Sequence, residues 1–429
     1  MSQHRRFSQH SVRKIPFAVT LTALLAIAPL GAGCGDDDDD DGAGAAGRGG
    51  SAQGGSQQTG GSAGASTAGS GGSRNEGGAG AAGSAQGGEG GSATDAVEIT
   101  GDRRIPFTPE TDREFIHFFI EHHQMAIHMA EMVVEGGSTP AIQALAERMV
   151  TAQTAEIETL REVEEELQDQ PEPPAMPADP HHEADMQHMM TLTGAELERM
   201  FLLDMIPHHA AGLPPAHRAR PHLTHPVLQT MAEDIAHQQA AEIGEMKALL
   251  DGLNVTTAGE DMAEAEPNRP DFGLVGDRRV PVTPDDVTFI DFFVPHHEMA
   301  VMMAEHVLAH GENAEVRALA QQMRTAQLEE IETMQAVREE LTGAADSPPM
   351  PADPHMQPEM AEMMEASGLE LDLMFLEEMI PHHAGGLPTA HRAKPHVENE
   401  QLATMSDDIY HAQAHEIGEM ERLLTELKP

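Results

Sequence analysis

Residues 122–132 read HHQMAIHMAEM, and 174 positions later residues 296–306 read HHEMAVMMAEH. Both stretches place apolar residues at three- and four-residue spacing and lack Pro and Gly, which is typical of an amphipathic helix. GDRRIPFTP at 101–109 likewise returns as GDRRVPVTP at 276–284, at an offset of 175 positions. The chain therefore contains two units that align without gaps across nearly their whole length, each of an ordinary domain size of about 155 residues.

A fainter repeat lies inside each unit, where a His pair is followed 31 positions later by a Gln-x-x-Glu-Ile segment. Residues 113–134 and 141–167 carry helical periodicity, and the run at 136–140 contains the Gly and Pro of a turn. Each half-unit is expected to be a helical hairpin, and no segment alternates with the period of a strand. The sequence predicts an all-α fold of two tandem antiparallel four-helix bundles, at 101–253 and 276–429, with a linker at 254–275.

The N-terminal part of the chain has the composition of an export signal followed by a tether. Within residues 1–34, basic residues precede an apolar stretch, and small residues lead to Cys34, the only cysteine. That order is typical of a secretory signal, and Cys34 resembles the acylated cysteine of a lipobox. The Asp run and Gly/Ser/Ala tract at 35–95 cannot bury a core and is expected to be disordered. We expect an exported protein, lipid-anchored in the cell envelope on the periplasmic or cell-surface side; plain secretion or a retained N-terminal anchor are the alternatives.

Charge and composition exclude one class of partner and favour another. The formal net charge of −47 repels nucleic acid and anionic membrane surfaces, and there is no Trp and one Tyr to stack on bases. Nucleic-acid binding is therefore excluded, and contact with a membrane is expected only through the lipid anchor. The chain has 28 Met and 26 His, so a metal ion is the partner to consider.

The first hairpin of each unit carries a stripe of His and Met on one helical face. His122, Met125, Met129 and Met132 are spaced i, i+3, i+7 and i+10, and the stripe returns as His296, Met299, Met303 and His306. Thioether and imidazole together select Cu(I), whereas imidazole also suits Cu(II) and zinc. Copper is therefore favoured, and ordinary core packing of the Met residues is the alternative. The predicted ligands are His122, His123, Met125, His128, Met129 and Met132, with His296, His297, Met299, Met302, Met303 and His306.

The second hairpins keep the His pairs but not the Met stripe. His208, His209, His382 and His383 are candidate ligands, and Pro214, Pro215 and Pro388 are expected to end their helices soon after them. Pro207, Pro295 and Pro381 directly precede three of the four pairs. Each such Pro either kinks a helix and frees a carbonyl, or opens a new helix at its first position.

On the partner helices, a Gln and a Glu share one face four times over. These side chains either hold the tautomer of a ligating imidazole or make hydrogen bonds across the bundle without a metal. The eight residues are Gln153, Glu156, Gln239, Glu242, Gln327, Glu330, Gln413 and Glu416.

These motifs resemble a known bacterial family. FFIEHHQMAIHMAE with AQTAEIETL, and FFVPHHEMAVMMAE with AQLEEIETM, resemble the domain of unknown function 305, and the second hairpins repeat the pattern. The resemblance implies a ferritin-like fold and, for some members, periplasmic copper binding through Met and His. We expect an envelope metal-binding protein for metal tolerance or storage. A ferritin-like di-iron oxidoreductase, which would use iron, and a metal-free interaction module are the alternatives, and zinc stays open as the metal.

Overall fold

The computed structural model describes residues 107–173, 186–253, 271–275, 278–282, 285–350, 353 and 355–428; Cys34 and the tether expected at 35–95 lie outside them. The first repeat contains α1 (Asp112–Gly136), α2 (Pro140–Glu166), α4 (Gly194–Ala219) and α5 (Pro226–Gly252). The second contains α6 (Asp286–His310), α7 (Ala314–Thr342), the short α8 (Met356–Met363), α9 (Gly368–Ala393) and α10 (Glu400–Leu427). The predicted all-α fold is confirmed.

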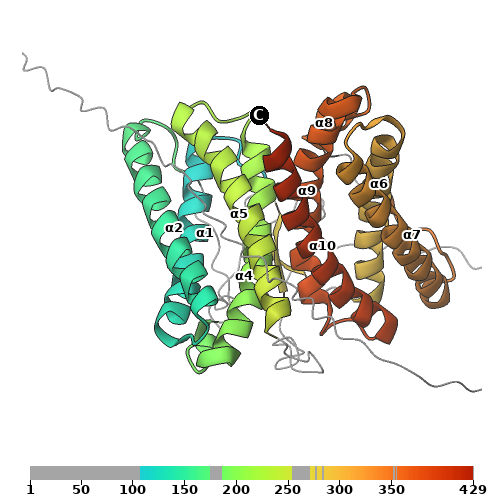
Figure 1. Cartoon of the computed structure of the whole chain (residues 1–429), viewed down its shortest axis with the longest axis horizontal. Coiled ribbons are helices and arrows are strands. Elements are labelled where there is room, and N and C mark those ends of the chain that lie inside the picture. The colour runs from blue at the N-terminus through green and yellow to red at the C-terminus, as the bar shows by residue number, and fades with distance from the viewer. Residues whose placement is uncertain are drawn as a thin grey trace, which may run out of the picture. The chain divides into compact units, whose positions relative to one another are not determined.

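Each repeat consists of two helical hairpins that pack through one helix of each (Figure 1). In the first repeat α1 pairs with α2 and α4 with α5, and α1 packs on α4. In the second repeat α6 pairs with α7 and α9 with α10, and α6 packs on α9. Helices α2 and α5, and likewise α7 and α10, touch over a much smaller area. Each bundle is therefore closed mainly on the side of its His-pair helices.

Two carboxylates in each repeat join its hairpins at the helix N-termini. The buried Glu198 of α4 accepts hydrogen bonds from the backbone N–H groups of Ser138 and Thr139 at the start of α2. Asp112 at the start of α1 accepts from the backbone N–H of Thr224, at 2.8 Å, just before α5. The second repeat has the same two contacts, through Asp372 and Asp286. Because helix N-termini expose unpaired N–H groups and a positive dipole end, these carboxylates fix the hairpin geometry.

The two repeats pack against each other through their second hairpins. Helix α5 lies along α10 and α4 along α9, and the apolar core is continuous between them. Where α5 meets α10, a Cβ built on Gly244 would lie 2.6 Å from the Cα of Gly418, and one on Gly418 would lie 2.4 Å from the Cα of Gly244. The two glycines are 174 positions apart, so equivalent positions of the repeats meet each other.

The prolines of the second hairpins lie inside helices, which corrects the prediction that Pro214, Pro215 and Pro388 end them. Pro207, Pro295 and Pro381 are also interior, so the alternative that each opens a helix is wrong. Tertiary packing outweighs the cost of an interior Pro here, because α4 and α9 are buried between neighbouring helices. One lost bond is replaced directly, since the carbonyl of Leu203, four residues before Pro207, accepts from the hydroxyl of Tyr410 at 3.0 Å.

One short sheet departs from the expectation that no strand would form. Strand β1 (Asp271–Val275) pairs antiparallel with β2 (Arg278–Val282), in register from Val275 with Arg278 to Asp271 with Val282. The stretch is rich in Val, and Gly-Asp between the strands is a sequence that favours a two-residue hairpin turn. Each strand has five residues, too few for a convincing period of two. The hairpin spans the linker and the first residues of the second unit, outside the helices.

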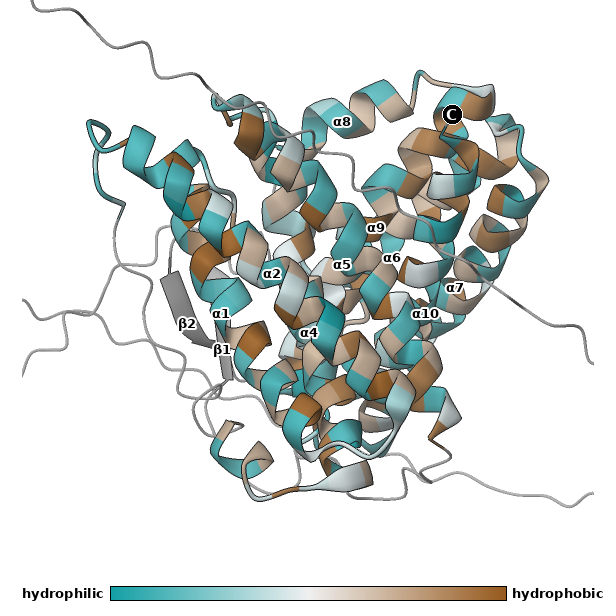
Figure 2. Ribbon diagram, turned by 60° about the vertical axis from the view of Figure 1, so that its left-hand side comes forward, coloured by the Kyte–Doolittle hydropathy of each residue, from teal (hydrophilic) through white to brown (hydrophobic). Residues whose placement is uncertain are grey.

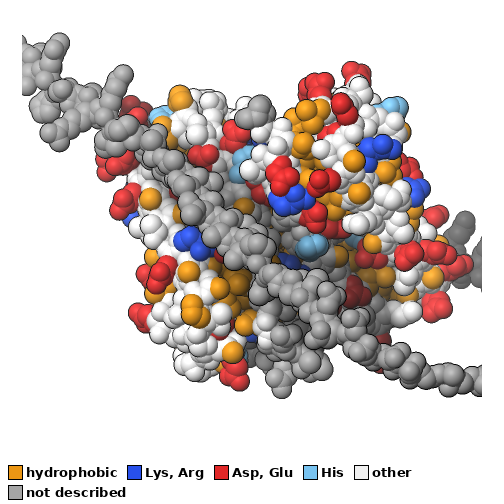
Figure 3. All heavy atoms as spheres, in the orientation of Figure 1, with side chains coloured by type: hydrophobic (Ala, Val, Ile, Leu, Met, Phe, Trp, Pro, Cys, Tyr) orange, Lys and Arg blue, Asp and Glu red, His pale blue; other side chains and the backbone are white. Residues whose placement is uncertain are grey.

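Most helices carry both polar and apolar residues along their length, as Figure 2 shows. On the face seen in Figure 3, acidic side chains are widespread and Lys and Arg are fewer, in keeping with the negative net charge. In the part of the chain that the structure describes, no helix combines the length and apolar character needed to cross a membrane.

Candidate metal centre

The four His pairs meet two by two in the middle of the repeats. The rings of His122 and His208 stack with centroids 4.0 Å apart, and those of His296 and His382 with centroids 3.9 Å apart. We call His122, His123, His208 and His209 the first histidine cluster, and His296, His297, His382 and His383 the second. The predicted pairs of one repeat are therefore brought together, although they are distant in sequence.

Backbone carbonyls hold the stacked rings. His208 Nε2 donates to the carbonyl of His122 at 3.0 Å. In the second cluster, His296 and His382 each donate from Nε2 to the other's carbonyl, at 3.0 and 3.1 Å. Burial lowers the pKa of His382 to about 3, with a smaller contribution from the neighbouring histidines, and burial also holds the pKa of His296 well below its ordinary value. These two rings are neutral at physiological pH.

The second histidine of each pair faces a glutamate of the partner helix. His209 Nε2 donates to Glu242 at 2.8 Å and His383 Nε2 to Glu416 at 2.9 Å. His123 and His297 lie 2.8 Å from Glu156 and Glu330, but without the angles of a hydrogen bond. The four imidazoles are fully buried, and the Nδ1 atom of each lacks a hydrogen-bond partner. The predicted Glu residues therefore contact the predicted His residues in all four hairpins.

The predicted glutamines lie in the same interior. Gln153, Gln239, Gln327 and Gln413 are buried, and the amide oxygen of each lacks a hydrogen-bond partner. Gly212 leaves room for Gln239 and for the ring of His122, because a Cβ there would lie 2.6 Å from Gln239 Oε1 and 2.7 Å from His122 Nε2. At Gly386, its counterpart in the second repeat, a Cβ would lie 2.9 Å from Gln413 Oε1. Buried polar atoms without protein partners are the usual mark of a site for water or an ion.

The Met stripe is divided between core and surface. Met129 and Met303 belong to the apolar core, where they are 4% and 1% exposed. Met125, Met299 and Met132 are half-buried, whereas His128 and Met302 are exposed. His306 lies 3.3 Å from the carbonyl of Ala366 through Nε2. Of the predicted thioethers, Met125 and Met299 combine partial access with a position one helical turn from a clustered histidine.

Within the described ranges, ligand atoms of three His or carboxylate side chains lie within 4.8 Å of one another at two places, and neither includes a predicted ligand. One is His117 with Glu164 and Glu172, and the other is His217 with Glu359 and Glu378. Sequence reasoning missed both because the members come from different helices and, in the second group, from different repeats. The repeated His-Arg-Ala near each Pro-rich segment (His217 and His391) was the available signal.

Comparison with known proteins identifies the family. Three solved structures resemble about a third of this chain: CopM in its Cu(II)-bound form (26% identity, 34% of this chain and 100% of that chain, TM-score 0.32), CopM in its Cu(I)-bound form (26%, 34% and 99%, 0.31) and a DUF305 protein from Streptomyces coelicolor (24%, 33% and 92%, 0.31). No functionally curated protein matches the sequence. The model of the family described as "Domain of unknown function (DUF305)" matches residues 56–164, 163–250 and 286–424. The chain belongs to the DUF305 family.

Proposed function

We propose that each repeat binds copper through the Nδ1 atoms of its buried, glutamate-held histidines, and that the protein serves metal tolerance or storage at the cell envelope. The observation that carries this proposal is the fourfold His–Glu contact. Metal-ligating histidines usually donate their other ring N–H to a carboxylate, which fixes the tautomer and raises the basicity of the ligating nitrogen. With Nε2 of His209 held by Glu242 at 2.8 Å, the lone pair belongs to Nδ1.

Burial supports the same assignment. Nδ1 of His123, His209, His297 and His383 is buried without a partner, and leaving a buried polar atom unpaired costs about 1–3 kcal/mol. A bound ion removes that cost. Burial lowers the pKa of the neighbouring His382 to about 3, so this ring brings no positive charge to the second cluster at neutral pH.

Copper is favoured over iron and zinc by the donor set. Neutral imidazoles with thioethers suit Cu(I), which accepts few ligands. Met125 and Met299 are partly exposed and lie one helical turn from His122 and His296, whereas Met129 and Met303 serve the core. A di-iron centre would need carboxylates that share a site, but Glu156 and Glu242 each face a histidine instead. The signal-like composition of residues 1–34 and the position of Cys34 support an envelope location.

Metal analysis of the full chain after exposure to Cu(I) under reducing conditions tests the proposal. The variant His123→Gln with His209→Gln should lose the copper of the first repeat, and His297→Gln with His383→Gln that of the second. All four changes together should abolish tight binding. His415→Gln is the matched control, because this side chain is 69% exposed and belongs to neither cluster. Copper retention by a folded fourfold variant would refute the proposal.

A further inference from the structure

The His217 group lies where the two repeats meet, apart from both histidine clusters. His217 comes from α4, Glu359 from α8 and Glu378 from α9. Nε2 of His217 lies 3.3 Å from Glu378 and 3.8 Å from Glu359. The three side chains are 14%, 16% and 33% exposed in the order His217, Glu378, Glu359, so the group is largely shielded from solvent.

These separations differ from those of the other buried His–Glu pairs. The four pairs of the histidine clusters are in direct contact at 2.8–2.9 Å. The carboxylates around His217 lie farther from its Nε2, at 3.3 and 3.8 Å. Two ligands bound at about 2.0–2.2 Å to a tetrahedral zinc ion are separated by roughly 3.3–3.5 Å. The His217–Glu378 distance therefore matches the edge of a coordination tetrahedron better than a direct hydrogen bond.

The positive charges nearby also distinguish the His217 group from the group of His117, Glu164 and Glu172. Near His117, the guanidinium of Arg113 lies 3.6 Å from Glu164 and pairs with Glu172, so those carboxylates already have a permanent cation. Arg218, the cation whose charge acts on Glu359, is paired with Asp353 at 2.6 Å. A proton on His217 would balance one of its two carboxylates, whereas a divalent cation balances both.

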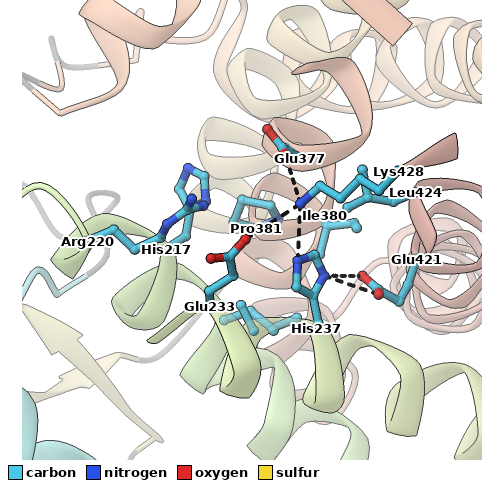
Figure 4. Close-up of a pocket in the computed structure, with 12 residues that line it drawn as sticks. His217, Arg220, Glu233, His237, Glu377, Ile380, Pro381, Glu421, Leu424 and Lys428 are labelled. Carbon is cyan, nitrogen blue, oxygen red and sulfur yellow. Dashed lines mark hydrogen bonds and ion pairs between the residues drawn. The ribbon is translucent and has the colours of Figure 1, made fainter. Parts of the chain in front are cut away.

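The surroundings provide both a rigid frame and a route for an ion. Arg218–Asp353 and a 3.3 Å contact between the rings of His222 and His355 tie the start of α8 to the end of α4. His217 also lines an open pocket between the repeats, shown in Figure 4, in which Lys428 and His237 are engaged with Glu377 and Glu421. An ion can therefore approach His217 from solvent.

We propose that His217, Glu359 and Glu378 form a site for a divalent cation of the zinc type, which joins the first repeat to α8 and α9 of the second. Imidazole with two carboxylates is a ligand set that zinc accepts in proteins, with water in the fourth position. The site contains no thioether, so Cu(I) is not the ion that we expect it to bind. It shares no residue with the copper sites proposed above, and either proposal can fail alone.

Zinc titration of the full chain against a chromophoric chelator tests this site. Glu378→Gln preserves size and removes one ligand charge, and it should weaken the tightest zinc site by at least about tenfold; His217→Gln should do the same. Zinc should also slow hydrogen exchange in α8 of the parent and not of Glu378→Gln. His117→Gln is the matched control, because it alters a His–Glu–Glu group that already holds an arginine.

Two results would overturn the proposal. One is equal zinc affinity in the parent and both His217-group variants. The other is a loss of affinity in His117→Gln as large as in Glu378→Gln, which would show that zinc binds acidic surface groups without preference. Cu(I) binding should be unchanged in Glu378→Gln, which separates this outcome from the fate of the histidine clusters.

Discussion

The hydroxyl of Tyr410 on α10 donates to the carbonyl of Leu203 on α4, at 3.0 Å and buried from solvent. Pro207 follows Leu203 by four residues and has no N–H, so this carbonyl has no partner within its own helix. A residue of the second repeat thus completes the backbone hydrogen bonding of the first. The bond links the interior proline of a His-pair helix to the packing of the repeats.

Tyr410→Phe should lower the free energy of unfolding by about 1–3 kcal/mol, because the Leu203 carbonyl would be left buried and unpaired. Urea denaturation checks this. Thr151→Ala removes an exposed hydroxyl that bonds only within its own helix, and it should cost less than about 0.5 kcal/mol. A Tyr410→Phe protein as stable as the parent would mean that water reaches the carbonyl.

Gly244→Ala should be strongly destabilising, since the added Cβ meets backbone rather than a movable side chain. We expect a loss of about 2 kcal/mol or more in the free energy of unfolding, or separation of α5 from α10. Gly252→Ala in the same helix adds a methyl group with nothing within 4 Å, and should be neutral or slightly stabilising. Comparable thermal midpoints for the two variants would contradict the close approach of the helices.

Gly212→Ala should disturb the first histidine cluster, because the new methyl group would collide with Gln239 Oε1 and His122 Nε2. If the proposed copper site is correct, Cu(I) stoichiometry should fall in the first repeat and stay intact in the second. Metal analysis of Gly212→Ala beside Gly386→Ala, which should show the reverse, tests this. Unchanged stoichiometry in both would place copper away from the clusters.

Met125→Leu should weaken Cu(I) binding by about tenfold while leaving Cu(II) and zinc binding nearly unchanged, since only the soft ion depends on a thioether. Met129→Leu is the matched control on the same helix, because its side chain is 4% exposed within the apolar core. Volume is nearly conserved in both, so stability should change little. Equal Cu(I) affinities in the two variants would assign the whole stripe to packing.

The metal-free protein should lose stability as pH rises above neutrality. Burial alone would lower the pKa of His217, but the Glu359 and Glu378 carboxylates raise it from its ordinary 6.5 to about 9. Because the folded pKa is the higher one, the stabilisation is complete below about pH 6.5 and disappears as pH rises to about 9. The loss should be about 3 kcal/mol, measured by urea denaturation with chelator present. In His217→Gln the same pH interval should have a smaller effect; parallel curves would exclude the charged imidazole.

The helices and the His–Glu contacts were predictable because they repeat. The 33-residue spacing of His123 and Glu156 recurs unchanged in every hairpin, and it predicts two facing helices. The interior prolines were not predictable from local rules, since their cost is offset by neighbours such as Tyr410 that lie far away in sequence. The His217 group needs two repeats in contact, and no periodicity within one repeat indicates Glu359.

A signal for the packing of the repeats was nevertheless present. Five positions after the partner-helix Gln, the second hairpins have Gly244 and Gly418, whereas the first hairpins have Glu158 and Glu332. In the described part of the chain, α5 and α10 approach each other closely at these two glycines, where a glutamate could not fit against the other backbone. The difference between hairpins within a repeat therefore indicated which helices would meet.

The glycine contact has a consequence for assembly. Equivalent surfaces that meet across an approximate two-fold axis form an isologous contact, the type that closes a homodimer. Here one polypeptide supplies both halves, so the contact that two single-repeat chains would share is satisfied internally. The pairing of the repeats is then independent of protein concentration. Even in dilute solution the contact between the repeats stays formed, with His217 on one side of it and Glu378 on the other.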